Sequence, residues 1–207
     1  MNKNSVIGSI VRAFLFLIFF AVLTGIVYTV VITGIGQLAF PKQANGSVIE
    51  IDGKTYGSEL LAQNFSDPKH LWGRPMNLDL TTFKDENGNA AMYATPRNKT
   101  PAGKEVDDSV KERLAALHAA DPDMKDVPVP VDLVTISGSS LDPDISPEAA
   151  EYQVHRIAKA RGISEDDVRK IIAVNTTGRW LGVFGNPHVN VLKVNLMLDG
   201  ILPVPAE

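Results

Sequence analysis

Apolar residues dominate one long stretch near the start of the chain, and no charged residue interrupts it between Arg12 and Lys42. A helix of roughly 20 such residues, at about 1.5 Å per residue, crosses a hydrocarbon layer of about 30 Å. Inside lipid, a single segment satisfies its backbone hydrogen bonds only as a helix. The pattern therefore predicts a transmembrane helix over residues 13–40, between a short segment, residues 1–12, and a linker, residues 41–46.

A cleaved signal peptide is the alternative for this stretch, but its apolar core spans only about 7 to 15 residues, which is too short. We therefore expect a retained, single-pass anchor in the inner (plasma) membrane of the cell. Lys3 and Arg12 precede the helix, and by the positive-inside rule this favours a cytoplasmic N-terminus. Residues 1–12 are then cytoplasmic, and residues 47–207 form an extracytoplasmic domain.

Small residues, or residues that can form hydrogen bonds, recur at every fourth position of the predicted span. They are Ala21, Gly25, Thr29, Thr33 and Gln37. Such stripes let helix backbones approach closely in lipid, and Thr or Gln side chains can hydrogen-bond across the contact. Gly25, Thr29, Thr33 and Gln37 are thus candidates for packing against a partner helix. The alternative is that these residues face lipid, with Gln37 reaching the interface.

Beyond the linker, the pattern changes to short alternating segments. Residues 48–51 alternate and are followed by an Asp-Gly turn signal, which predicts a β-hairpin that returns through residues 55–56. A serine then favours a short capped helix over residues 58–65. Residues 66–104 are rich in Pro, Gly, Asn and Thr, a composition typical of a long irregular segment.

The second half of the chain predicts helices and one more strand. Apolar positions at helical spacing mark a helix over residues 106–119 and another over residues 146–161, the latter with a Ser-Pro-Glu start. Ser164 opens a third helix, with acidic residues in its first turn. Residues 189–196 alternate like a strand. The fold class is therefore α+β: a single N-terminal transmembrane helix followed by one mixed α/β soluble domain.

Charge and composition narrow the function classes. Residues 43–207 carry 17 Lys and Arg against 24 Asp and Glu, so 17 − 24 gives a formal charge of −7. A nucleic-acid partner is therefore not expected. The chain contains no cysteine, which excludes disulfides and thiolate chemistry. The four histidines, His70, His118, His155 and His188, lack paired metal-ligand spacing, so no metal site is predicted.

The residues 137–147 combine hydroxyls with carboxylates, which raises the possibility of a hydrolase. A nucleophilic Ser needs a base and an orienting acid, and Asp142, Asp144 and His155 are the nearest candidates. The chain has no Gly-x-Ser-x-Gly elbow and no Walker-type phosphate loop. Because Ser, Gly, Asp and Pro before a helix are typical of turns and caps, we expect a hydrogen-bonded loop here and no catalytic residue.

Three motifs carry a family resemblance that covers nearly the whole chain. The first is the Gly-Arg-Pro triplet at 73–75, the second is the segment 129–162, and the third is Gly-Asn-Pro-His-Val-Asn-Val-Leu at 185–192 with the Asn-Leu pair that follows. Together they strongly resemble the C subunit of the bacterial Kdp potassium-transporting P-type ATPase (KdpC family). The motif residues are Gly73, Arg74, Pro75, Ser137, Gly138, Leu141, Asp142, Pro143, Ser146, Pro147, Tyr152, Arg156, Asn190 and Asn195.

The resemblance implies an accessory, non-enzymatic subunit of an ATP-driven potassium importer. Its expected partners are the potassium-carrying A subunit, the ATP-hydrolysing B subunit and the small F subunit. The family is described as a catalytic chaperone that raises the ATP affinity of the B subunit, with Gln153 as the implied nucleotide contact. No firmly bound cofactor is implied, only ATP in a transient complex. From the residues alone, we interpret Gln153 as a surface or helix-contact residue.

Departures from the family pattern and the predicted topology leave alternatives open. Ser140 and Asp144 stand where the family usually has Gly and His, so no role of that His is carried over. ATP is cytoplasmic, whereas the domain is expected outside, so an effect on ATP affinity would have to act over a long range. The alternatives are a membrane-anchored extracytoplasmic sensor or ligand-binding module, and a membrane-anchored hydrolase, which would need a base within reach of Ser139 or Ser140.

Overall fold

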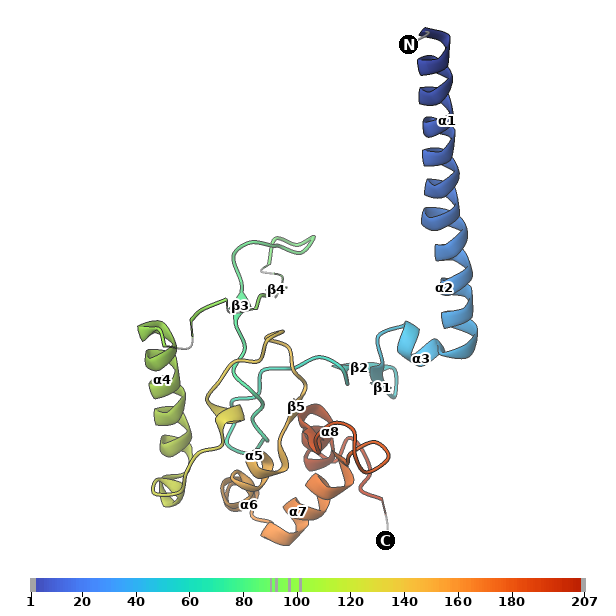
Figure 1. Ribbon diagram of the computed structural model, residues 1–207. Coiled ribbons are helices and arrows are strands. Elements are labelled where there is room, and N and C mark those ends of the chain that lie inside the picture. The colour runs from blue at the N-terminus through green and yellow to red at the C-terminus, as the bar shows by residue number, and fades with distance from the viewer. Residues whose placement is uncertain (1–2, 90, 92, 97, 101, 206–207) are drawn as a thin grey trace. The chain divides into compact units, whose positions relative to one another are not determined.

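The computed structural model describes residues 3–89, 91, 93–96, 98–100 and 102–205, and the chain forms two compact units, the second of which begins at Ile49. The first unit is helical: α1 (Lys3–Val22) continues through one π-helical turn (Leu23–Val27) into α2 (Tyr28–Ala39) (Figure 1). The 34 residues of Val6–Ala39 are long and apolar enough to cross a membrane. The predicted long apolar helix is thus confirmed.

The helical backbone is longer than the predicted span of residues 13–40, because α1 begins at Lys3 and runs through the segment expected to precede the membrane. Within the predicted linker, Pro41–Ala44 forms the short helix α3. The amide groups of Gln37 and Asn45 hydrogen-bond to each other across this turn, at 3.1 and 3.3 Å. The Gln37 side chain therefore has a partner within its own chain.

The second unit opens with the predicted hairpin, β1 (Val48–Ile51) and β2 (Lys54–Ser58). Its turn residues Asp52 and Gly53 have φ of 52° and 73°, the left-handed values that the tight hairpin turn requires. The prediction of a helix over residues 58–65 is wrong, because no helix forms there. The N–H of Ala62, which would close its first turn, donates instead to the carbonyl of Leu141 at 3.0 Å. A contact with a distant loop thus replaces the local helix.

Between the hairpin and the C-terminal half, the chain is largely irregular, as expected. Leu78–Asp79 (β3) and Tyr93–Ala94 (β4) pair as two short antiparallel strands. The helix α4 (Lys104–Ala120) matches the one predicted over residues 106–119. Two 3₁₀ turns follow, Pro122–Met124 and Val131–Leu133.

The C-terminal half combines a small antiparallel sheet with four helices. The strands run in the order β5-β7-β6, with Ile145 opposite Val189 and Thr176 opposite Val189. Their bounds are β5 Asp144–Ile145, β6 Thr176–Thr177 and β7 His188–Asn190, and the helices are α5 Pro147–Glu151, α6 Val154–Arg161, α7 Glu165–Val174 and α8 Val191–Leu198. Figure 1 shows α4 on one side of this unit and α6 to α8 on the other, with irregular chain between them.

The predicted helix caps are confirmed, but the helix expected over residues 146–161 is broken. Ser146 accepts from the N–H of Ala149 at 3.2 Å, and Ser164 from that of Asp167 at 3.1 Å. Tyr152 and Gln153 form a turn between α5 and α6, in which the N–H of Gln153 donates to the carbonyl of Ala150. The break turns the two helices relative to each other and directs Gln153 inward.

The prediction of a strand over residues 189–196 is correct only as far as residue 190 and wrong beyond it. β7 ends at Asn190, whose side chain accepts from the N–H of Lys193 at 3.1 Å and so caps α8. Val191, Leu192 and the apolar residues after them are buried at spacings that also suit one face of a helix. The apolar spacing of this short segment therefore fits both a strand and a helix. The capping Asn190 is the local signal that favours the helix.

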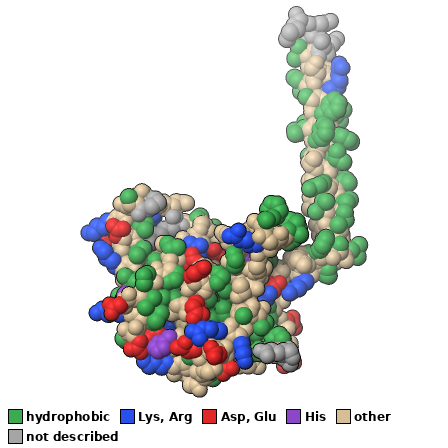
Figure 2. All heavy atoms as spheres, turned by 60° about the horizontal axis from the view of Figure 1, so that its bottom comes forward, with side chains coloured by type: hydrophobic (Ala, Val, Ile, Leu, Met, Phe, Trp, Pro, Cys, Tyr) green, Lys and Arg blue, Asp and Glu red, His purple; other side chains and the backbone are tan. Residues whose placement is uncertain are grey.

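One hydrophobic core serves the whole second unit. Its buried members come from the irregular segment, the second 3₁₀ turn, β5, β7 and all of the helices α4 to α8. The largest include Leu71, Trp72, Leu133, Ile157, Val168, Val189 and Val194. On the face drawn in Figure 2, acidic and basic side chains are interspersed among apolar ones.

Candidate functional site

The backbone of Leu71 and Trp72 is the most buried part of the long irregular segment. Both residues lie in the core, yet neither belongs to a strand or helix. A buried N–H or carbonyl without a hydrogen bond costs free energy comparable to a lost bond. The polar groups of this segment must therefore be satisfied by side chains from elsewhere.

Two amide side chains supply these bonds. Asn195 on α8 accepts from the N–H of Leu71 at 2.7 Å and donates to its carbonyl at 2.9 Å. Gln153 accepts from the N–H of Trp72 at 2.8 Å and donates to its carbonyl at 3.0 Å. Each amide thus takes the place of a neighbouring strand for one residue.

Arg156 on α6 completes the arrangement, and we refer to Gln153, Arg156 and Asn195 together as the clamp. The guanidinium of Arg156 donates to Gln153 Oε1 at 2.6 Å and to the carbonyl of His70 at 3.0 Å. Its Cζ lies 4.4 Å from the centre of the Trp72 ring, a favourable cation–π distance. Burial lowers the pKa of Arg156 to about 10, so the group stays charged at neutral pH.

Arg113 on α4 contacts the clamped segment from the other side. It donates to the carbonyl of Gly73 at 3.1 Å and to that of Leu133 at 3.0 Å, and its Cζ lies 5.0 Å from the Trp72 ring. Sequence reasoning did not single out Arg113, because nothing within its own helix marks it. Its role depends on two carbonyls that are distant in the chain.

Most of the other motif residues lie in the loop of residues 137–147 or contact it. Arg74 donates to Asp142 at 3.3 Å, and Asn190 donates to Asp144 Oδ1 at 3.0 Å. The motif residues Leu141 and Pro143 accept, through their carbonyls, from backbone N–H groups of residues 62 and 191. Pro147 occupies the first turn of α5. The Tyr152 hydroxyl donates to the carbonyl of Met124. Gly138 is exposed.

The contacts of Ser140 account for the presence of serine where the family usually has glycine. Its φ of 65° is in the left-handed region, where glycine is favoured. The Ser140 hydroxyl accepts from the N–H of Asn77 at 2.7 Å, a bond that glycine cannot form. Asp144, the other departure, is half-buried, and burial raises the pKa of its carboxyl, with the Asn190 hydrogen bond opposing that shift.

The structure does not bring a base to the serines within the part of the chain that it describes. Ser137 and Ser139 hydrogen-bond to each other, and Ser139 accepts from the N–H of Leu141. His155 instead pairs with the buried Asp121 at 2.9 Å. These contacts are those of a hydrogen-bonded loop, and they provide no support for the hydrolase alternative.

Asp121, Asp123 and His155 form the one group with candidate metal-binding geometry among the described residues, with ligand atoms within 4.8 Å of one another. Lys159, however, donates to Asp123 at 2.8 Å, and this ion pair lowers the pKa of the Asp123 carboxyl. A cationic side chain already satisfies that carboxylate, so the group is accounted for as an ion-pair network.

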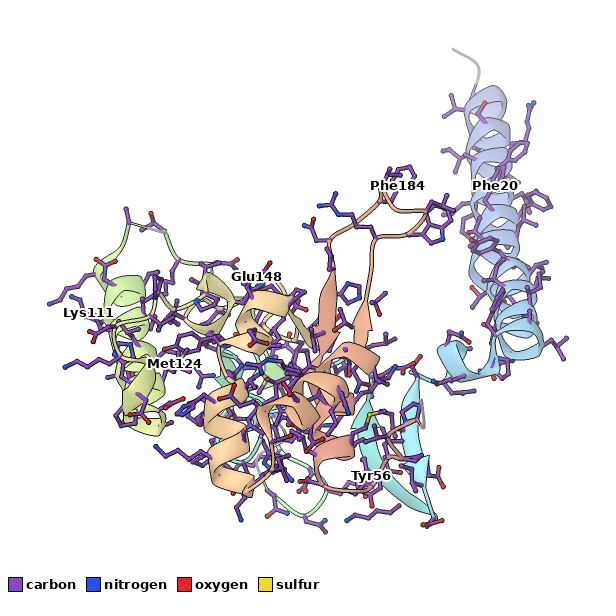
Figure 3. All side chains as sticks on the ribbon, turned by 90° about the horizontal axis from the view of Figure 1, so that it is seen from below. Phe20, Tyr56, Lys111, Met124, Glu148 and Phe184 are labelled. Atoms are coloured by element: carbon purple, nitrogen blue, oxygen red, sulfur yellow. The ribbon has the colours of Figure 1, made fainter. Side chains whose placement is uncertain are left out.

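An open groove of about 720 Å³ lies beside α5 and α7, and Met124 and Glu148, labelled in Figure 3, are among its lining residues. A ligand site needs a few polar groups that converge on the ligand. Here the Tyr152 hydroxyl is bonded to the Met124 carbonyl, and Arg169 is paired with Glu151 and Glu165. The groove therefore gives little support to a ligand-binding module.

From the sequence we interpret Gln153 as a surface or helix-contact residue; it is 1% exposed, so the surface interpretation is wrong. Its Oε1 accepts from Trp72 and Arg156, and its Nε2 donates to the carbonyls of Trp72 and Ala149. All four of its usual hydrogen-bonding positions are occupied within the chain. A nucleotide contact through Gln153 would require the clamp to open, and such a contact stays a prediction.

Comparison with known proteins gives consistent matches over most of the chain. Residues 10–200 match the family described as "K+-transporting ATPase, c chain". A protein of Clostridium botulinum strain Eklund 17B, named potassium-transporting ATPase KdpC subunit, is 54% identical over 92% of this chain and 95% of its own length. Proteins of the same name from Clostridium perfringens and Sorangium cellulosum are 53% and 49% identical over 92% and 86% of this chain, and over 96% and 90% of their own lengths.

Proposed function

The chain belongs to the KdpC family of potassium-transporting ATPase subunits, and from this premise we propose that it is the non-catalytic subunit that assembles and stabilises the transport complex. Its partners are then a potassium-carrying A subunit, an ATP-hydrolysing B subunit and a small F subunit. The observation that carries the proposal is that Gln153 and the motif residues Arg156 and Asn195 bind the backbone of their own domain. Such residues build a rigid domain that can be presented to partners.

We further propose that the subunit raises the ATP affinity of the B subunit indirectly, through the assembled complex. Two features support an indirect effect. Gln153 has no vacant hydrogen-bonding position, and Lys3 and Arg12 favour a domain on the side of the membrane opposite to ATP. Coupling between two sites then runs through membrane-spanning segments that have two arrangements.

Two clamp variants distinguish the indirect effect from direct contact. Gln153→Met and Asn195→Leu both release the irregular segment, but only the first removes the implied nucleotide contact. In the purified complex, we expect both variants to raise the apparent Km for ATP by a similar factor, about fivefold or more. A raised Km in the Gln153 variant alone would establish direct contact, and an unchanged Km in both would refute an effect on ATP affinity.

The proposed orientation is tested by labelling single cysteines, because the native chain has none. We expect Lys84→Cys and Lys111→Cys, both at exposed positions of the domain, to react with a membrane-impermeant maleimide in intact cells. Lys3→Cys, before the span, serves as the control and should react only after lysis. The reverse pattern would place the domain in the cytoplasm and restore direct ATP contact as the simpler account.

A further inference from the structure

The loop that joins β6 to β7 exposes four large apolar side chains at its far end. Trp180, Leu181, Val183 and Phe184 are 69%, 72%, 68% and 60% exposed. Figure 3 shows Phe184 at the tip of this long loop, away from the helices of its own domain. We call residues 179–184 the apolar tip. Clusters of this kind on soluble surfaces usually mark an interaction site.

The apolar tip has a defined backbone. Trp180 and Phe184 exchange backbone hydrogen bonds of 2.9 and 3.0 Å, and their rings lie 5.6 Å apart. Leu181 and Gly182 turn the chain with φ of 51° and 77°. A leucine with positive φ is uncommon and conformationally unfavourable, and such backbone strain concentrates at functional segments. The turn thus holds an apolar side chain outward at a conformational cost.

The chain segment that carries the apolar tip has a charge opposite in sign to that of the domain as a whole. No Asp or Glu occurs between Asp167 and Asp199, whereas residues 43–207 as a whole have a formal charge of −7. Arg179, exposed and next to Trp180, gives the tip a cation of its own. Trp and Phe combined with Arg are the residues that favour the interface between water and an anionic lipid surface.

The linker ties the domain that carries this tip to the helix that can span a membrane. The helix that can span a membrane ends at Ala39, and β1 begins at Val48. The residues between them, 40–47, reach at most about 28 Å even when fully extended. A tethered group has a high effective concentration at the surface, so even a weak affinity for lipid suffices.

We propose that the apolar tip inserts into the interfacial layer of the bilayer that holds the chain's own helix. Trp180 and Phe184 enter the region between headgroups and acyl chains, while Arg179 contacts lipid phosphates. The domain is thereby attached at a second point. A protein partner is the less favoured occupant, because a stable interface buries about 800 Å² on each side, more than these few side chains offer. The inference needs only the membrane anchor, so it does not depend on the partners proposed above.

A single fluorescent probe tests the insertion. Leu181→Cys, labelled with the environment-sensitive dye NBD, is compared with Val131→Cys, an apolar position that is 64% exposed elsewhere on the domain. The full-length chain is reconstituted in nanodiscs of phosphatidylethanolamine and phosphatidylglycerol, with or without spin-labelled phospholipid. We expect the spin label to lower the emission at position 181 at least about twofold, as for a group 5–10 Å deep, and to leave position 131 unchanged.

Three further arms make the test decisive. Val183→Cys provides a second probe site in case the label at Leu181 disturbs the turn, and Trp180→Ser with Phe184→Ser should abolish the quenching at either site. The experiment is then repeated with the partner subunits present. Lipid quenching that persists there supports the proposal. Water-like emission at both sites, or shielding that appears only with the partner subunits and without lipid quenching, overturns it.

Discussion

Gln153→Met lowers the free energy of unfolding of the domain by about 3 to 5 kcal/mol, the largest loss that we expect from a single substitution that keeps side-chain volume. Methionine fills the same space but leaves the N–H and carbonyl of Trp72 without partners in a buried site. It also removes an acceptor from the buried Arg156. Each buried group left without a bond costs about 1 to 3 kcal/mol, so the losses accumulate.

The matched control is Gln63→Met. Gln63 is only partly buried and makes one hydrogen bond, from Nε2 to the carbonyl of Tyr56 at 2.8 Å, so we expect a loss of about 1 kcal/mol. Urea unfolding of the full-length chain in detergent measures both, with Trp72 fluorescence as the probe in a Trp180→Phe background. Equal, small losses for the two variants would contradict the clamp.

A double-mutant cycle shows whether the clamp acts as one unit. Asn195→Leu alone frees the backbone of Leu71, the residue next to Trp72. Once one amide is gone and the segment has moved, the second has less to hold, so the combined loss should fall short of the sum by about 0.5 to 3 kcal/mol. Additive losses would mean that the two amides stabilise the segment independently.

Gly25→Leu combined with Thr29→Leu should reduce co-purification of the partner subunits about tenfold, because a close helix contact is worth roughly 0.6 to 2 kcal/mol per interacting residue. Both positions lie on the stripe of small residues, and Gly25 falls within the π-helical turn Leu23–Val27. Local π turns are often found at functional positions in helices. A Cβ at Gly25 would have no atom within 4 Å apart from the adjoining backbone of its own helix, so the small size of Gly25 is free to serve a contact with another helix.

The control for this variant keeps its hydrophobicity and helix position. Val30→Leu with Val31→Leu adds bulk to the same helix away from the stripe and should leave co-purification unchanged. The pull-down uses an affinity tag on this chain in mild detergent, with the amount of each partner quantified. If the stripe and control variants recover the same amount, helix packing through Gly25 and Thr29 is refuted.

Features that depend on neighbours in the chain were predictable from the pattern alone. The long apolar helix, the Asp52-Gly53 turn and the caps at Ser146 and Ser164 all appear as expected. A cap or a tight turn is decided by groups within about four residues of each other, and the membrane helix by its own apolar length. For these elements, the interacting groups lie within the same short segment of the sequence.

Where a local signal competed with a distant partner, the distant partner prevailed. The helix expected over residues 58–65 does not form, because the N–H of Ala62 donates to the distant carbonyl of Leu141. The clamp is the clearest case: Gln153 and Trp72 are 81 residues apart, and Asn195 and Leu71 are 124 apart. An amide has the same chemistry on a solvated face and in a core. Its burial depends on which backbone groups the folded chain leaves without partners, and no window of neighbouring residues contains that information.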